Sequence, residues 1–145
     1  MKARIVGMVL VAMLAVLGCT KNTSMSSVTS LASNPLVTSL TSALGLNATQ
    51  AIGGAGALLG LAQHNLAGAD WSKVAAAVPG ASSLISQAKS LGGISQFTNL
   101  AGLSGAFTKM GLSADQVKSL PPAMTDQVSK AAGPEVGNLF AGAIK

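Results

Sequence analysis

The sequence feature that most constrains the fold is a run of twelve residues, 51–62, made only of Ala, Gly, Leu and Ile. Gly53, Gly56 and Gly60 share one face of a helix drawn over this run. A glycine inside a helix costs about 1 kcal/mol relative to alanine, so three on one side indicate that another helix comes close. The run therefore predicts a central helix over about 48–66, packed on both faces. The opposite face carries Ala51, Ala55, Leu58, Leu59, Ala62 and Leu66.

The rest of residues 35–145 also has helical periodicity, and it lacks the β-branched and aromatic clusters that are typical of strands. We expect an all-α, compact bundle of about six or seven short helices around the central Gly/Ala-rich helix. The tandem prolines Pro121 and Pro122 lack two backbone donors, so they are expected to kink or split the helix that follows Ser113. Asp70 is expected to cap the third helix. The other expected helices cover 36–44, 81–90, 94–110 and 134–144.

Two segments of the chain echo one another. Residues 45–51 read GLNATQA, and residues 111–117 read GLSADQV. Both contain a glycine that can end a helix, and both place a capping residue three positions before a glutamine. The echo is either the same local solution used twice or the trace of an ancient duplication.

The first eighteen residues predict a cleaved signal peptide. Lys2 and Arg4 precede fourteen residues, 5–18, that carry no charge. That length suits a signal-peptide core and is too short to cross a bilayer. The run ends in Val-Leu-Gly-Cys, residues 16–19, which resembles a bacterial lipobox. The resemblance implies cleavage before Cys19 and attachment of lipid to its sulfur, with soluble periplasmic release as the alternative.

The mature chain is expected to begin with a lipidated tether. Residues 20–34 include eight Ser or Thr among fifteen, so residues 19–34 are interpreted as lipidated Cys19 plus a flexible tether, and residues 35–145 as the helical domain. In Gram-negative lipoproteins an Asp directly after the lipidated Cys usually means retention in the inner membrane. Thr20 stands there instead, which favours the periplasmic face of the outer membrane.

Composition argues against most kinds of chemistry. The chain has one Cys, one His and four acidic residues, which disfavours a metal site, and nothing indicates a cofactor. Removal of the signal lowers the net charge from +5 to +3, and the seven remaining lysines are scattered, so no nucleic-acid partner is expected. His64 and Asp70 could contribute to a hydrolytic triad, but no nucleophile is placed on a strained turn. We expect no enzyme activity.

Several blocks of the sequence together resemble a known family. The run at 51–62, the segment VPGA at 78–81 and the segment FTKMGLS at 107–113 are similar to the uncharacterised VcgC/VcgE family of bacterial envelope proteins. The resemblance covers roughly residues 36–144, and it extends through residues 117–121 and 133–143. It implies an all-helical fold and an envelope location, and it carries over no catalytic or binding residue.

The sequence leaves three functions open. The first is a non-catalytic, lipid-anchored interaction or structural module of the cell envelope, held to the membrane through its lipid and able to bind an envelope protein. The second is a periplasmic carrier of a small apolar ligand. The third is a self-associating protein that pairs through a glycine zipper, because Gly56 and Gly60 have the small-residue spacing.

Overall fold

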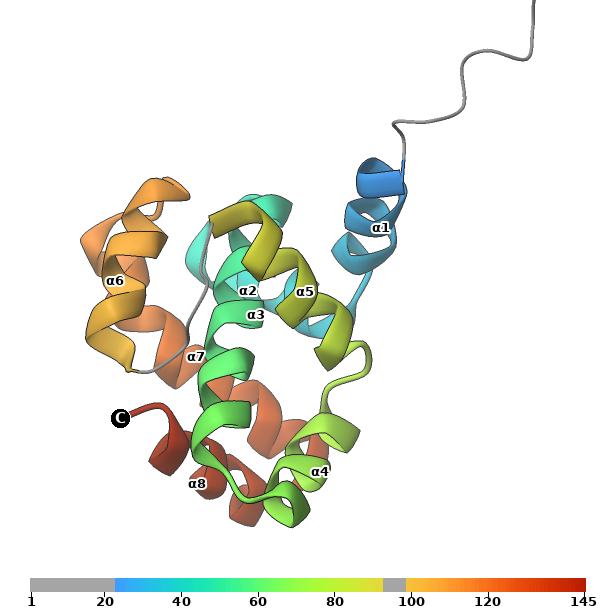
Figure 1. Ribbon diagram of the computed structural model, residues 1–145, viewed down its shortest axis with the longest axis vertical. Helices are drawn as coiled ribbons and strands as arrows, with labels where there is room; N and C mark the ends of the chain where they lie inside the picture. The colour runs from blue at the N-terminus through green and yellow to red at the C-terminus, as the bar shows by residue number, and fades with distance from the viewer. Residues whose placement is uncertain (1–22, 93–98) are drawn as a thin grey trace, which may run out of the picture.

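Helix α3 (Ala48–Asn65) runs through the middle of the molecule, with other helices packed around it (Figure 1). The computed structural model describes residues 23–92 and 99–145. All twelve residues from Ala51 to Ala62 are buried, so α3 is covered on every side. The prediction of a central helix packed on both faces is therefore confirmed, and a helix that is apolar all round is one that lies in a core.

The described residues form an all-α bundle without strands, as expected from the sequence. The eight helices exceed the expected six or seven by one, at the N-terminal end. The most extensive packing joins α3 to α5, and the next most extensive joins α7 to α8. The helices around α3 are α1 (Thr23–Ala32), α2 (Pro35–Leu44), α4 (Gly68–Ala77), α5 (Ala81–Gly92), α6 (Leu100–Lys109), α7 (Ala114–Ala132) and α8 (Pro134–Ala143).

Helix α1 corrects the prediction of a flexible tether over residues 19–34 for residues 23–32, while residues 19–22 lie outside the described residues. Its first residue is Thr23, and Leu31 is only 8% exposed in the common core. Val28, one turn earlier on the same face, packs against that core. The Ser/Thr content predicted a tether, but two apolar residues at i, i+3 spacing suffice to bury one side of a short helix against a neighbour. The globular part thus begins before residue 35.

The helix boundaries follow local signals with two exceptions. Asp70 does not cap α4, whose N-cap is Ala67; instead Asp70 lies in the first turn, where its carboxylate accepts from Lys73 at 3.0 Å. The second exception is Asn99, inside the helix expected over 94–110. Its backbone is extended and its side chain accepts from the Gly102 N–H, so it is the N-cap of α6, which begins at Leu100. Residues 94–98 of that expected helix lie outside the described residues.

The tandem prolines do not split α7. The helix is continuous from Ala114 to Ala132, with Pro121 and Pro122 inside it. On the next turn the Thr125 hydroxyl donates to the Pro121 carbonyl at 3.0 Å. Buried Leu120, Met124 and Val128 lie on one face before and after the prolines. Packing of that face holds the helix together where two backbone donors are missing.

The two echoed segments lie against each other. Both predicted capping boxes are present, at Asn47–Gln50 and at Ser113–Gln116. Each glutamine accepts from its own cap residue through its oxygen, and its amide nitrogen donates to a backbone carbonyl at the other helix junction. Gln50 donates to the Gly111 carbonyl at 2.8 Å, and Gln116 donates to the Leu44 carbonyl at 3.2 Å. The repeated motif thereby ties the α2–α3 and α6–α7 junctions together.

We predict that α1 stabilises the domain. The fragment 23–145 should melt several degrees above the fragment 35–145, because removal of α1 uncovers the core beside Leu31. Within 23–145, Leu31→Ala should lower the free energy of unfolding by roughly 2–5 kcal/mol, the usual cost of truncating a buried leucine. Thermal and urea melts followed by circular dichroism measure both effects. Ser33→Ala, an exposed position two residues away, is the control. Equal melting of the two fragments would contradict a packed α1.

Candidate functional site

The predicted lipid-attachment residue, Cys19, and the predicted signal peptide, residues 1–18, lie outside the described residues. None of the described helices is long and apolar enough to span a bilayer. The first described residue, Thr23, is separated from Cys19 by only three residues.

The three glycines of the predicted packing face are all buried in α3. A β-carbon at Gly56 would collide with the backbone carbonyl of Leu84 and would lie 2.7 Å from the β-carbon of Ala88. The backbones of α3 and α5 are therefore in direct contact at this point. A β-carbon at Gly53 would lie 2.5 Å from the sulfur of Met110, which covers that position with a flexible side chain. Both glycines are thus covered by residues of the same chain.

A further close approach, at Gly54, was not predicted. A β-carbon there would lie 2.7 Å from Cδ2 of Leu120 on α7. Gly54 falls outside the face that the sequence pattern singled out, because it follows Gly53 directly and points elsewhere around the helix. Glycines on different sides of α3 therefore allow two other helices to approach closely, α5 at Gly56 and α7 at Gly54.

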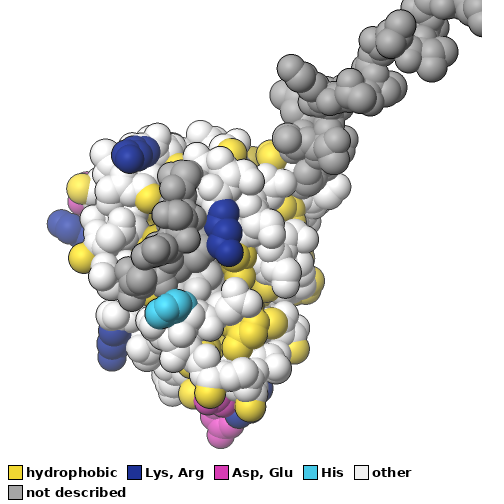
Figure 2. Space-filling model, in the orientation of Figure 1, with side chains coloured by type: hydrophobic (Ala, Val, Ile, Leu, Met, Phe, Trp, Pro, Cys, Tyr) yellow, Lys and Arg dark blue, Asp and Glu magenta, His cyan; other side chains and the backbone are white. Residues whose placement is uncertain are grey.

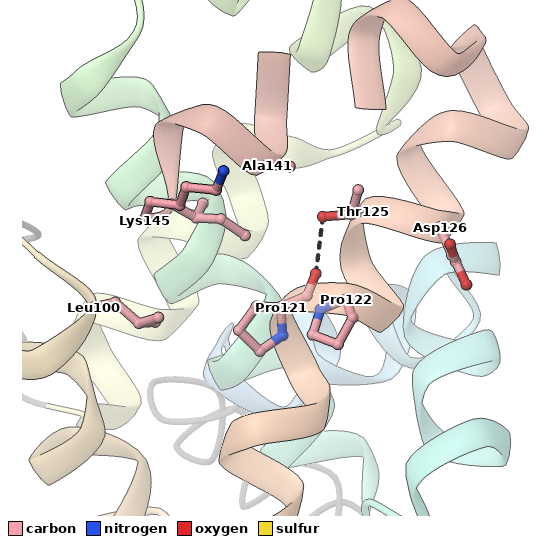
Figure 3. A pocket seen from close by; sticks show the side chains of 8 residues that line it. Leu100, Pro121, Pro122, Thr125, Asp126, Ala141 and Lys145 are labelled. Atoms are coloured by element: carbon pink, nitrogen blue, oxygen red, sulfur yellow. Dashed lines mark hydrogen bonds between the residues drawn. The ribbon is translucent and has the colours of Figure 1, made fainter. Parts of the chain in front are cut away.

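A hollow lined by described residues lies between α6, α7 and α8 (Figure 3). Its volume is about 360 Å³. Binding pockets for small molecules typically have volumes of about 300–1,000 Å³ and mostly apolar walls. The residues that line it are Leu100, Pro121, Pro122, Thr125, Asp126, Ala141, Ile144 and Lys145.

The geometry of α7 and α8 explains the position of the hollow. The two helices form a hairpin that turns at Gly133, where φ is +93°. Next to the turn they are in close contact, since a β-carbon at Gly137 would collide with the hydroxyl of Ser129. Farther from the turn, the proline rings and the small side chain of Ala141 leave space that α6 closes only at Leu100. The hollow is therefore the open end of the hairpin.

The sequence analysis did not predict this hollow. Ile144, which forms part of its wall, is buried. The tandem prolines were the available signal, because prolines inside a helix mark a local irregularity of that helix. Nothing in the local pattern shows that Leu100 lies opposite them.

His64 and Asp70, the two residues considered for catalysis, do not line this hollow. His64 is exposed at the end of α3, with its ring Nδ1 3.1 Å from the side-chain oxygen of Asn65. Asp70 is engaged with Lys73 on α4. No three metal-ligating side chains cluster anywhere in residues 23–92 or 99–145. On the face shown in Figure 2 the Lys side chains lie apart from one another, without forming a basic stripe.

We predict that the contact at Gly56 is essential for stability. Gly56→Ala should lower the free energy of unfolding by roughly 1–3 kcal/mol through overpacking, because the opposing group is a backbone carbonyl that cannot rotate away. Buried Gly60→Ala should act in the same direction. Gly53→Ala should cost less than Gly56→Ala, since the Met110 side chain can move. Urea unfolding measures all three.

Gly105 on α6 provides the matched control for this series. It lies inside a helix, and a β-carbon there would meet no other atom. Gly105→Ala should therefore stabilise by up to about 1 kcal/mol through helix propensity. If Gly56→Ala stabilised the protein as Gly105→Ala does, the contact between α3 and α5 would not be as close as described.

Comparison with known proteins gives one result. No curated protein and no solved structure matches the chain. One family model matches residues 12–144, which extends the resemblance seen at 36–144 into the N-terminal region. That match covers well over half of the 145 residues. The chain therefore belongs to the family described as protein of unknown function VcgC/VcgE (DUF2780).

Proposed function

We propose that this protein is a lipid-anchored, non-catalytic interaction or structural module of the cell envelope, located at the periplasmic face of the outer membrane. The observation that carries the proposal is the segment at 16–19, which ends a charged-then-apolar signal in the only cysteine of the chain. A diacylated N-terminus gives two or more buried chains, which is enough for stable anchoring. Cleavage without lipidation, giving a soluble periplasmic protein, is the alternative location.

The position of α1 supports a domain held close to the membrane. Only residues 20–22 separate Cys19 from the start of α1 at Thr23. Four residue steps of fully extended chain reach at most about 14 Å. Thr23, the first residue of α1, would therefore lie within about 14 Å of the anchored Cys19.

The proposal of a non-catalytic role rests on the scarcity of reactive groups. The chain has four acidic residues, one His and one Cys, and the Cys is assigned to the lipid. Asp70 is paired with Lys73, and His64 is exposed with Asn65 as its neighbour. General acid–base catalysis needs such groups to converge on one substrate position.

A second function, the carriage of a small apolar ligand, is favoured by the hollow of about 360 Å³ between α6, α7 and α8. This role is compatible with a lipid anchor. The third alternative, self-association through a glycine zipper, is disfavoured, because Gly53 and Gly56 are covered by Met110 and α5 of the same chain.

We predict lipidation at Cys19. Metabolic labelling of cells with an alkyne analogue of palmitate should tag the wild-type protein and spare Cys19→Ala, because the thioether forms only at that sulfur. Gel fluorescence after click conjugation measures the label, and a known lipoprotein in the same lysate is the control. An untagged, freely soluble wild type would overturn the anchor.

We also predict that the residue after Cys19 sorts the protein. Thr20→Asp should shift the protein from the outer-membrane to the inner-membrane fraction of a sucrose gradient, because Asp at this position usually retains lipoproteins in the inner membrane. Thr20→Asn is the control, because the asparagine side chain has the shape of aspartate without its charge. Recovery of the wild type in the inner membrane would contradict the proposed location.

A further inference from the structure

The hollow at the open end of the α7–α8 hairpin has a chemically uneven wall. Five of its lining residues, Leu100, Pro121, Pro122, Ala141 and Ile144, offer only carbon atoms from their side chains. The Thr125 hydroxyl is engaged, since it donates to the Pro121 carbonyl at 3.0 Å (Figure 3). Two charged side chains remain, those of Asp126 and Lys145, and both are exposed.

These two charges are separated across the site. In Figure 3 Lys145 and Asp126 lie on opposite sides of the lining residues, and the Asp126 carboxylate is directed away from Lys145. They do not form an ion pair with each other. One end of the apolar wall is therefore next to an ammonium group and the other end is next to a carboxylate, and the two groups are not paired with each other.

The volume limits the size of the ligand. At about 30 Å³ for each water-sized group, a hollow of about 360 Å³ holds on the order of ten heavy atoms. An alkyl chain of about eight carbons with a small polar head has this size. The apolar wall suits the chain, since its transfer from water into an apolar environment is favourable.

We infer that this hollow binds a short single-chain carboxylate, with its alkyl chain against Leu100, Pro121 and Ile144 and its carboxylate beside the Lys145 ammonium. The inference rests on the second proposed function, the carriage of a small apolar ligand, and adds the class of the ligand. It does not depend on the lipid anchor. A carboxylic acid of this kind is ionised at neutral pH, so its head carries the charge that complements Lys145.

The test compares three ligands of equal chain length: octanoate, octanol and octylamine. Each is titrated into the mature, methyl-labelled chain as isolated from cells, without a bilayer, with chemical shifts of the Leu100, Ala141 and Ile144 methyl groups as the readout. Octanoate should bind about two- to fivefold more tightly than octanol, the range expected for an exposed ion pair. Octylammonium should bind most weakly.

Two charge variants test the placement of the head group. Lys145→Gln should remove the advantage of octanoate over octanol, and Asp126→Asn should keep or increase it. Both residues are exposed, so neither substitution should impair folding. Ala141→Leu should fill the hollow and abolish saturable shifts for all three ligands. Ala76→Leu, exposed on α4, is the matched control and should leave binding unchanged.

The outcomes separate the inference from the function on which it rests. If octanol binds and is blocked by Ala141→Leu but octanoate binds no more tightly, the carboxylate assignment is overturned and the carrier function stands. If no ligand gives saturable shifts, both are overturned. Binding that persists in Ala141→Leu would place the ligand elsewhere and would overturn the assignment of this hollow.

Discussion

The contact between Gly56 of α3 and the Leu84 carbonyl of α5 is the constraint on which the rest of the packing depends. No side chain fits between the two backbones, so α3 and α5 approach more closely than ordinary helices can. This close approach compensates for a shortage of aromatic side chains, of which the chain has only three Phe and one Trp. Dense packing of small residues replaces the bulk that large side chains supply in other cores.

With α3 covered on all sides, the other helices need only one apolar face each. Phe107, Leu120 and Phe140 are the largest fully buried side chains of α6, α7 and α8. The echoed junctions then fix how these helices connect, because Gln50 and Gln116 each cap their own helix and bond a carbonyl of the other junction. No polar or charged residue is buried in the described core, so the polar groups that hold the fold lie at helix ends.

The same packing produces the hollow. Close contact at Gly137 and Ser129 brings α7 and α8 together at one end of their hairpin, while Pro121 and Pro122 line the hollow at the other end. A site at the open end of a rigid hairpin can admit a small ligand without moving the core. In the proposed setting, the short link to Cys19 would hold α1 near the lipid surface. The C-terminus, which lies beside the hollow, is on the other side of the molecule from α1 (Figure 1).

The sequence by itself determined the features that depend on residues within one turn of each other. These are the all-helical class, the central run at 51–62, the glycine that ends α2 and the two capping boxes. Propensity, periodicity and caps act over three or four positions, so they can be read from a single chain. Tertiary structure alone decided that α1 docks through Leu31, that Leu84 covers Gly56, and that Leu100 faces Pro121. Each of these three contacts joins two surfaces that are distant in sequence. Local preference does not determine which apolar faces meet.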